Sequence, residues 1–419
     1  MPVIKKKFKY KPLSLKDIIR EMKQNIDLMF DLAYSAIKFG SKEIADEAYN
    51  IEQRIHELTF LLNFQIIKTQ TRGFKEAKKL EPVVVMGYSI DKISDALSDI
   101  ARVVYINNDI IEFTQLFWDY VPEPIVKITV NAGCEFIGES RKDVHFRSKY
   151  GVNIIAIRRG KKWFFHRDIK IKLNDILILK GEKKPLMTIK EICQDEDPIS
   201  FQIEEEKEIS IFNLEIEDVF EMANHIKKDY VKITDISETM TELALAALLF
   251  NNAELAEDVL EMEELMDGLN ISLEKDLLEF AGEIENNRDL TGIMRIVFSC
   301  ELIADAAANI AESILKGFKP HRILQKAVEE TSEIVVREVL SEDSFFKGKT
   351  YSELQDRRYK RGFHIIALKR EDKWIYSFKP DFVLQQGDLV IGLGPKETVE
   401  QWRRCVHPEK YNKNKNKIE

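Results

Sequence analysis

Glycine, proline and cysteine are scarce in this chain, with 17, 11 and 4 residues among 419. Few helix breakers favour long helices over a fold built on many tight turns. The four cysteines are widely scattered without a CxxC spacing, which argues against a zinc framework and a disulfide scaffold. We expect reduced thiols in a cytosolic protein.

Long hydrophobic runs are also missing. The longest mostly apolar stretch lies around Leu243 to Phe250, far below the roughly 20 residues that span a bilayer. The N-terminal MPVIKKKFKYKPL has no apolar core, so we expect no export signal. A formal net charge of −9 argues against a general nucleic-acid binder. We expect a globular protein of roughly three or four domains that meets membranes only through a partner.

The sequence repeats itself at a shift of 211 residues, which carries Asp31 onto Glu242. From these residues, DLAYSAIKFGSKEIADEAYNIEQRIHEL aligns without a gap with ELALAALLFNNAELAEDVLEMEELMDGL. At the same shift, GVNIIAIRRGKKW from Gly151 aligns with GFHIIALKREDKW from Gly362. A shift held over separate blocks indicates an internal duplication, so each half is predicted to be one structural unit.

Each copy begins with a helical part. Apolar residues spaced three and four apart predict one buried helix face, formed by Ile90, Ile93, Leu97, Ile100 and Val104. Gly40-Ser41 and Asn251-Asn252 stand at equivalent positions between two such patterns. We predict that each pair is the turn of an antiparallel helical hairpin, with a short polar residue capping the second helix.

Each copy ends with a part rich in strands. After Pro122 and Pro124, the β-branched and aromatic runs IVKITV, VNIIAI, KWFFH and DILILKG follow one another, and EIVVREV, FHIIAL, KWIYSF and DLVIGLG repeat them. A short helical stretch is expected at 140–150 and at 352–361. The order strand, helix, two-stranded hairpin and final strand predicts a small α+β module that buries one sheet face against its second copy.

These residues carry a family resemblance. The Ala-, Leu- and Glu-rich hairpins and the [DE]-x-x-x-D motif before an Ala-rich helix resemble PhoU domains. The blocks FIGESRKDVHFRSKYGVNIIAIRRGKKW and FKGKTYSELQDRRYKRGFHIIALKREDKW, each followed by a final strand, resemble TrkA C-terminal (RCK-C) regulatory domains. The matching positions in the two copies are Gly138 and Gly348, Gly151 and Gly362, and Asp175 and Asp388.

The resemblance implies an α+β architecture in which two PhoU-like antiparallel helical bundles alternate with two RCK-C-type modules, as in a group of mainly archaeal proteins. The expected parts are a basic arm at 1–14, bundles at 15–113 and 205–325, modules at 114–195 and 326–408, and a disordered tail at 409–419. No GxGxxG follows a strand, so the resemblance does not extend to NAD binding.

Carboxylates spaced four apart on helices are the candidate metal ligands. Asp91 and Asp95 match Glu301 and Asp305 in the repeat, whereas Glu263 and Asp267 match Glu52 and His56. PhoU resemblance implies a metal cluster on the bundle surface, with ligands Asp91, Asp95, Glu301, Asp305, Glu52, Glu263 and Asp267. Oxygen ligands favour Mg²⁺, Mn²⁺ or iron over Zn²⁺. The open alternative is a solvated acidic face, because 72 acidic residues produce many such pairs by chance.

A second candidate site lies where the central strand of each module ends. Arg158 and Arg159 stand opposite Lys369 and Arg370 in the repeat, and RCK-C resemblance implies that a small effector such as cyclic di-AMP binds where two modules meet. These cations would contact its phosphates. The open alternative is a charged hairpin turn without a ligand.

The sequence therefore predicts a cytosolic regulator that is not an enzyme. No HExxH, GxSxG or other catalytic spacing occurs, although a two-metal hydrolase stays as a minor alternative. The expected partners are a membrane cation transporter, chiefly for potassium, and a small-molecule or ion effector; nucleic acid is not expected, and a homodimer stays open. The other interpretation is a metal-binding, PhoU-like signalling adaptor of phosphate uptake.

Overall fold

The fold is described from a computed structural model of the chain. The described residues are 13–68, 73–106, 124–144, 146–160, 162–165, 169–181, 183–196, 217–283, 290–317, 333–354, 363–371, 373–375, 378 and 381–408. Nearly all of the expected basic arm and the whole expected tail lie outside them.

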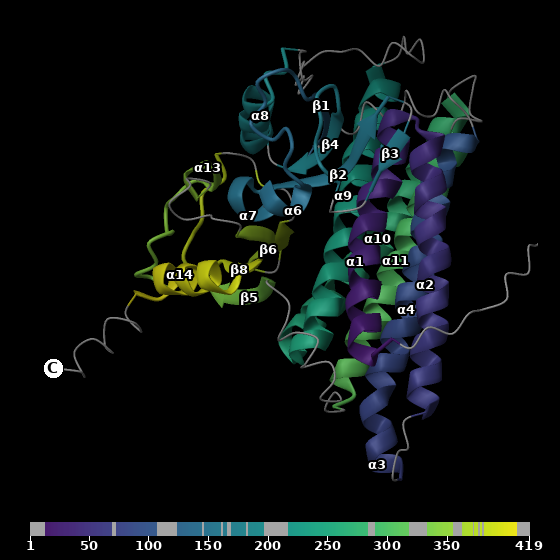
Figure 1. Cartoon of the computed structure of the whole chain (residues 1–419). Helices are drawn as coiled ribbons and strands as arrows, with labels where there is room; N and C mark the ends of the chain where they lie inside the picture. Colours follow the sequence, from purple (N-terminus) through teal and green to yellow (C-terminus); the bar gives the residue numbers. More distant parts are fainter. Residues whose placement is uncertain are drawn as a thin grey trace, which may run out of the picture.

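The helical parts form two bundles of three long helices each (Figure 1). Bundle 1 consists of α1 (Leu15–Phe39), α2 (Lys42–Lys68) and α4 (Glu81–Ala101). A short helix α3 (Phe74–Ala77) and a 3-10 turn η1 (Lys78–Leu80) precede α4, and a second turn η2 (Arg102–Tyr105) follows it. Bundle 2 consists of α9 (Glu217–Phe250), α10 (Ala253–Glu283) and α11 (Leu290–Leu315).

The turns between the first two helices of each bundle confirm the predicted hairpins. Gly40 and Asn251 adopt left-handed backbone conformations, with φ angles of 57° and 51°. The next residue caps the following helix in both copies. The Ile44 amide donates to Ser41 Oγ at 3.4 Å, and the Leu255 amide donates to Asn252 Oδ1 at 3.2 Å. The duplicated sequence thus produces the same turn twice with different residues.

The two bundles join through α4 and α11, which pack against each other. Their antiparallel direction is marked by Lys316 at the end of α11, whose Nζ lies 3.9 Å from Glu81 Oε1 at the start of α4. The predicted apolar face of α4 is buried, and it belongs to one core shared by both bundles. The six long helices run alongside one another, with the sheets on one side (Figure 1).

Two small sheets of equal topology complete the fold. Module 1 contains β1 (Ile125–Thr129), α6 (Arg141–Val144), α7 (Phe146–Tyr150), β2 (Val152–Arg159), β3 (Lys162–Phe164), β4 (Ile176–Gly181) and α8 (Lys183–Ile192). Module 2 contains β5 (Glu333–Val339), α13 (Tyr351–Leu354), β6 (His364–Arg370), β7 (Lys373–Ile375), β8 (Leu389–Pro395) and α14 (Lys396–Val406). The antiparallel strand orders are β1-β4-β2-β3 and β5-β8-β6-β7.

The equivalence of the modules extends to an irregularity of their central strands. The register shifts between Ile154 and Ala156 in β2, and between Ile365 and Ala367 in β6. The α+β fold class and its tandem arrangement are therefore confirmed. The helices α8 and α14, which follow the last strand of each module, were not expected from the sequence.

Each sheet has two buried faces. One face packs within its own module, where Leu177 and Leu179 of β4 lie in a core with residues of α8. The other face, which includes Ile178 of β4 and Ile391 of β8, belongs to the core of the helical bundles. The expected cover for this face was a second copy of the module, whereas the structure supplies helices. Trp163 and Trp374 pack against the same helical core.

Every helix in the described part of the chain is too short or too polar to span a lipid bilayer.

Candidate functional site

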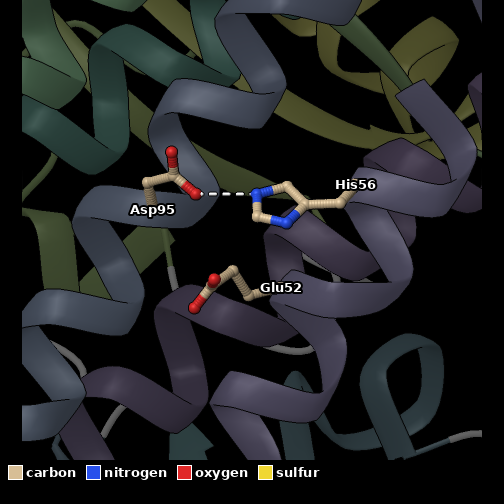
Figure 2. Close-up of side chains that lie close together, drawn as sticks. All are labelled: Glu52, His56 and Asp95. Atoms are coloured by element: carbon tan, nitrogen blue, oxygen red, sulfur yellow. Dashed lines mark hydrogen bonds and ion pairs between the residues drawn. The ribbon is translucent and has the colours of Figure 1, made fainter. Parts of the chain in front are cut away.

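The predicted ligands of bundle 1 come together with a histidine on the outer surface of α2 and α4. Residues four apart on a helix lie on one face, so Glu52 and His56 of α2 face Asp91 and Asp95 of α4; we call these four residues cluster 1. His56 Nε2 lies 2.9 Å from Asp95 Oδ1 and 3.7 Å from Asp91 Oδ1. Figure 2 shows the imidazole between the two helices, with Glu52 one turn away.

The charges of cluster 1 compensate one another. Burial by itself lowers the pKa of His56, but the hydrogen bond with Asp95 and the nearby carboxylates outweigh it, so the pKa is raised above 6.5. Burial raises the pKa of Asp91, while the His56 charge opposes this shift. The histidine, when protonated, therefore places a positive charge beside these carboxylates. Glu52, His56 and Asp95 each place one potential ligand atom within 4.8 Å of the others.

Bundle 2 has the equivalent group without the histidine. Glu263 and Asp267 of α10 face Glu301 and Asp305 of α11; we call these four residues cluster 2. Asp267 occupies the place of His56 in the repeat. Burial, the hydrogen bond with Asp267 and the charges of the other carboxylates raise the pKa of Glu301 to about 7. Burial and neighbouring carboxylates also raise the pKa values of Glu263 and Asp305.

Cluster 2 thus has negative charge that its own residues do not neutralise. Glu301 Oε2 is buried without a hydrogen-bond partner, and Lys92 of α4 is the cation that lowers the pKa of Asp305. Such a group can relieve its repulsion by holding a proton, as the raised pKa of Glu301 indicates, or by binding a cation. Its donors are carboxylate oxygens, which suit a hard divalent ion.

The structure therefore divides the seven predicted metal ligands into two separate groups, one in each bundle. His56 was not among the predicted ligands, and it lies between the carboxylates of Asp91 and Asp95. The signal was present in the repeat, where a basic residue stands opposite an acidic one.

Two of the predicted effector-binding residues instead secure the last strand of their own module. Arg159 contacts Asp175 through Nε and Nη2 at 2.7 and 2.8 Å, and Arg370 contacts Asp388 at 2.8 Å through both atoms. Both aspartates are fully buried. Each also accepts a backbone hydrogen bond three residues upstream, from Lys172 or Gln385. These bidentate pairs explain why the matched aspartate precedes the last strand.

The other two predicted effector-binding residues also have protein partners. Arg158 donates to the carbonyl of Gly160 at 3.1 Å and lies over the Trp163 ring. Lys369 lies over the Trp374 ring and forms an ion pair with Glu261 of α10. A phosphate ligand would have to compete with these contacts, and the proposed effector-binding role of the four residues stays a prediction.

Ion pairs that were not expected from the sequence join the sheets to the helices. In module 2, Arg337 Nε lies 2.7 Å from Asp258 Oδ2 of α10, and its Nη1 lies 2.9 Å from Glu254 Oε2. In module 1, Lys180 Nζ lies 2.6 Å from Glu238 Oε1 of α9 and 3.6 Å from Asp31 Oδ1 of α1. Such pairs join distant parts of the chain and leave no local sequence pattern.

The pair of Arg337 and Asp258 is deeply placed, since the aspartate side chain is only 4% exposed. Burial raises the pKa of Asp258, and the Arg337 guanidinium opposes this shift. Losing either partner would leave a buried charge uncompensated. A displacement of β5 would therefore change the contacts of α10.

A further ion cluster joins α9 to α10 at the surface of bundle 2. His225 Nδ1 lies 2.8 Å from Asp276 Oδ2 and 3.8 Å from Asp229 Oδ2. The histidine side chain is 60% exposed, so this cluster is a solvent-screened contact between helices.

Models of known protein families match the helical bundles and module 1. The model of the PhoU domain matches residues 19–104 and 230–314, and the model of the TrkA-C domain matches residues 125–194. These ranges contain most of both bundles and the elements of module 1. Module 2 lies outside the TrkA-C match and has the same strand order as module 1.

One curated relative and several solved structures are similar to parts of the chain. The Synechocystis sp. protein named uncharacterized transporter sll0640 is 30% identical over 67 residues, which cover 16% of this chain and 11% of the relative. PhoU from Pseudomonas aeruginosa is 12% identical, with a TM-score of 0.37 over 72% of this chain and 97% of that one. The GsuK channel bound to NAD is 13% identical, with a TM-score of 0.17 over 77% of this chain and 66% of that one.

The fold and its matches define a protein of tandem helical bundles that each carry a small sheet module. The chain contains two PhoU domains and a TrkA-C domain. Both domains belong to regulatory families. The predicted resemblance is thereby confirmed.

Proposed function

We propose that this protein is a cytoplasmic regulator that senses a small ligand or ion and modulates a membrane cation transporter. The observation that carries the proposal is the combination of PhoU and TrkA-C domains in one chain. The transporter name of the Synechocystis relative supports it. We further propose that the regulator reaches the membrane through the transporter itself.

The mechanism uses the contacts between sheets and helices. A ligand that binds a module favours the strand arrangement for which it has the higher affinity. The free energy by which it shifts the equilibrium between the two arrangements cannot exceed the difference between its binding free energies for them. The pair of Arg337 and Asp258 would pass a change in β5 to α10, and Lys180 with Glu238 would pass a change in β4 to α9. The helices then present the altered surface to the transporter.

The proposal is tested by deleting the gene in its own host and measuring uptake of potassium, with rubidium as tracer, and of inorganic phosphate. We expect potassium uptake to change and phosphate uptake to stay the same. Complementation with wild type should restore uptake, whereas Arg337→Gln should not. Lys347→Gln, at an exposed lysine of module 2, is the control and should restore it. Unchanged potassium uptake in the deletion strain contradicts the proposal.

The effector is tested on the purified chain by calorimetry with cyclic di-AMP and a panel of adenine nucleotides. Binding that weakens at least tenfold in a chain carrying Arg158→Gln and Lys369→Gln supports a site at the strand ends. These two cations are chosen because Arg159 and Arg370 hold buried aspartates, so their loss would disturb the fold. Binding that is unchanged in the double variant places the effector elsewhere.

A second function is favoured by cluster 2. The carboxylates of cluster 2, with the raised pKa and the buried, unpartnered oxygen of Glu301, would have to close around a divalent cation such as Mg²⁺, Mn²⁺ or iron. Among the described residues, the groups that already hold three ligand atoms within 4.8 Å of one another are those around His56 and His225. A cation bound by cluster 2 would make the protein a metal-binding signalling adaptor of phosphate uptake. Tightly held metal in the purified chain that is lost in Glu301→Ala, together with altered phosphate uptake in the deletion strain, would favour this function over the first.

A further inference from the structure

Module 1 contains two cysteine thiols that touch in its core. Cys134 lies in the loop between β1 and α6, and Cys193 directly follows α8. Their Sγ atoms are 3.2 Å apart, and both residues are buried among the apolar side chains of the module. Both are free thiols in the structure.

The backbone around the two thiols is already held together. The Asn131 amide donates to the Cys193 carbonyl at 3.1 Å, and Asn131 Nδ2 donates to the Gln194 carbonyl at 2.8 Å. The end of α8 is therefore fixed against the loop after β1. A disulfide has a sulfur–sulfur distance of about 2.05 Å. To form one, the two sulfurs must move closer together, while the backbone segments that carry them are already hydrogen-bonded to each other.

The two thiols differ in acidity, which gives each a separate part in an oxidation. The hydrogen bond with Cys193 lowers the pKa of Cys134 to about 7, although burial opposes the shift. The same contact and burial raise the pKa of Cys193. Because the thiolate is the nucleophile, Cys134 is the sulfur that attacks first near neutral pH.

We propose that Cys134 and Cys193 are an oxidation site at which a small peroxide forms a disulfide that ties α8 to the loop after β1. The Cys134 thiolate attacks one oxygen of hydrogen peroxide, the oxygen–oxygen bond breaks, and a sulfenic acid and hydroxide form. Cys193 sulfur then displaces the sulfenic hydroxyl group, which leaves as water with the Cys193 proton. Overall, two thiols lose two electrons and two protons, and one peroxide becomes two waters.

The duplication supplies an internal control for this site. Asn131 and Ser341 are equivalent, since Asn131 contacts the Cys193 carbonyl and Ser341 Oγ donates to the Val406 carbonyl at 2.6 Å. Valine thus replaces Cys193 at the end of α14. Ser344 stands at the place of Cys134, and its Oγ donates to the Cys405 carbonyl at 3.5 Å. Oxidation would therefore cross-link module 1 and leave module 2 unchanged.

The experiment treats the full chain with hydrogen peroxide, counts thiols after unfolding in the presence of a thiol reagent, and maps peptides by mass spectrometry. We expect two of the four thiols to disappear and a peptide linking Cys134 to Cys193 to appear. Dithiothreitol should restore both thiols. The oxidised chain should also unfold at a higher urea concentration than the reduced chain. From pH 6 to pH 8 the oxidation rate should rise about tenfold, as the Cys134 thiolate fraction does.

Matched variants use the residues that module 2 itself carries at these positions. Cys134→Ser and Cys193→Val should each abolish the linked peptide, whereas Cys405→Ser should retain it. Four thiols remaining after peroxide treatment, a link between chains only, or oxidation of Cys134 to sulfonic acid without the linked peptide would overturn the proposal. The wild-type peptide map decides the matter even where a variant fails to fold. The proposal is independent of the transporter and of the metal.

Discussion

Replacing Glu301 by glutamine removes a carboxyl group that the folded protein holds at an unusual pKa. Burial, Asp267 and the other carboxylates of cluster 2 raise the pKa of Glu301 from 4.5 to about 7. One pKa unit corresponds to about 1.4 kcal/mol, so the full shift corresponds to about 3 kcal/mol. Because Glu301 is only half-buried, solvent screening reduces the effect to about 1 kcal/mol.

The sign of the pH dependence follows from the direction of the shift. A carboxyl whose pKa is higher in the folded state binds its proton more tightly there than in the unfolded chain. Stability therefore falls as the pH rises from 4.5 through about 7, and the loss is complete above that range. We expect Glu301→Gln to match wild type near pH 5 and to exceed its free energy of unfolding by about 1 kcal/mol near pH 8.5.

The measurement is urea unfolding followed by circular dichroism at both pH values, in a buffer with chelator so that no metal neutralises the cluster. Glutamine can still donate to Asp267, so the hydrogen bond is kept. The control is Glu279→Gln, an exposed position on α10 away from cluster 2, which should change stability equally at both pH values. The reasoning is refuted if Glu301→Gln gains no stability at pH 8.5 relative to pH 5.

Three further outcomes are expected. His56→Asp gives cluster 1 four carboxylates, the number that cluster 2 has, so calorimetry should show Mn²⁺ binding there at least tenfold tighter than in wild type. Unchanged binding argues against a metal role for these carboxylates. Arg337→Gln leaves Asp258 buried without its cation and should lower the free energy of unfolding in urea by about 3 kcal/mol. The loss should be smaller when Asp258→Asn is added, and strictly additive effects of the two changes would mean that the residues are not coupled. Gly40→Ala places a side chain at a φ of 57° and should cost about 1 kcal/mol, whereas a higher thermal midpoint would show that the turn is not strained.

Much of the fold could be predicted because its helices and strands follow from local sequence patterns. The spacing of Ile93, Leu97 and Ile100 fixes the buried face of α4, and alternating β-branched runs separated by glycine or asparagine fix the strands. Because the sequence is duplicated, an element predicted in one half was supported by the equivalent pattern in the other half. The contacts of Lys180 and Arg337 could not be predicted in this way, because their partners lie on helices whose position depends on the folded whole.

The candidate sites show a different limit of prediction. The repeat made Asp91 and Glu301 equivalent, and the structure places them at equivalent sites, yet their surroundings differ by one residue, His56 against Asp267. A single exchange of this kind replaces a carboxylate by a histidine and changes the charge of the cluster.

The same reasoning applies to the modules and gives a general way to find function in a duplicated chain. Equivalent backbones demand the same structural residues, which is why Arg159 with Asp175 recurs as Arg370 with Asp388. A residue that structure alone requires should therefore recur in both copies. Where two equivalent positions have the same backbone conformation but side chains of different chemistry, the fold does not require either residue. The contacting thiols of module 1 meet this condition, as the histidine of cluster 1 does, so function specific to one half is to be sought at these positions first.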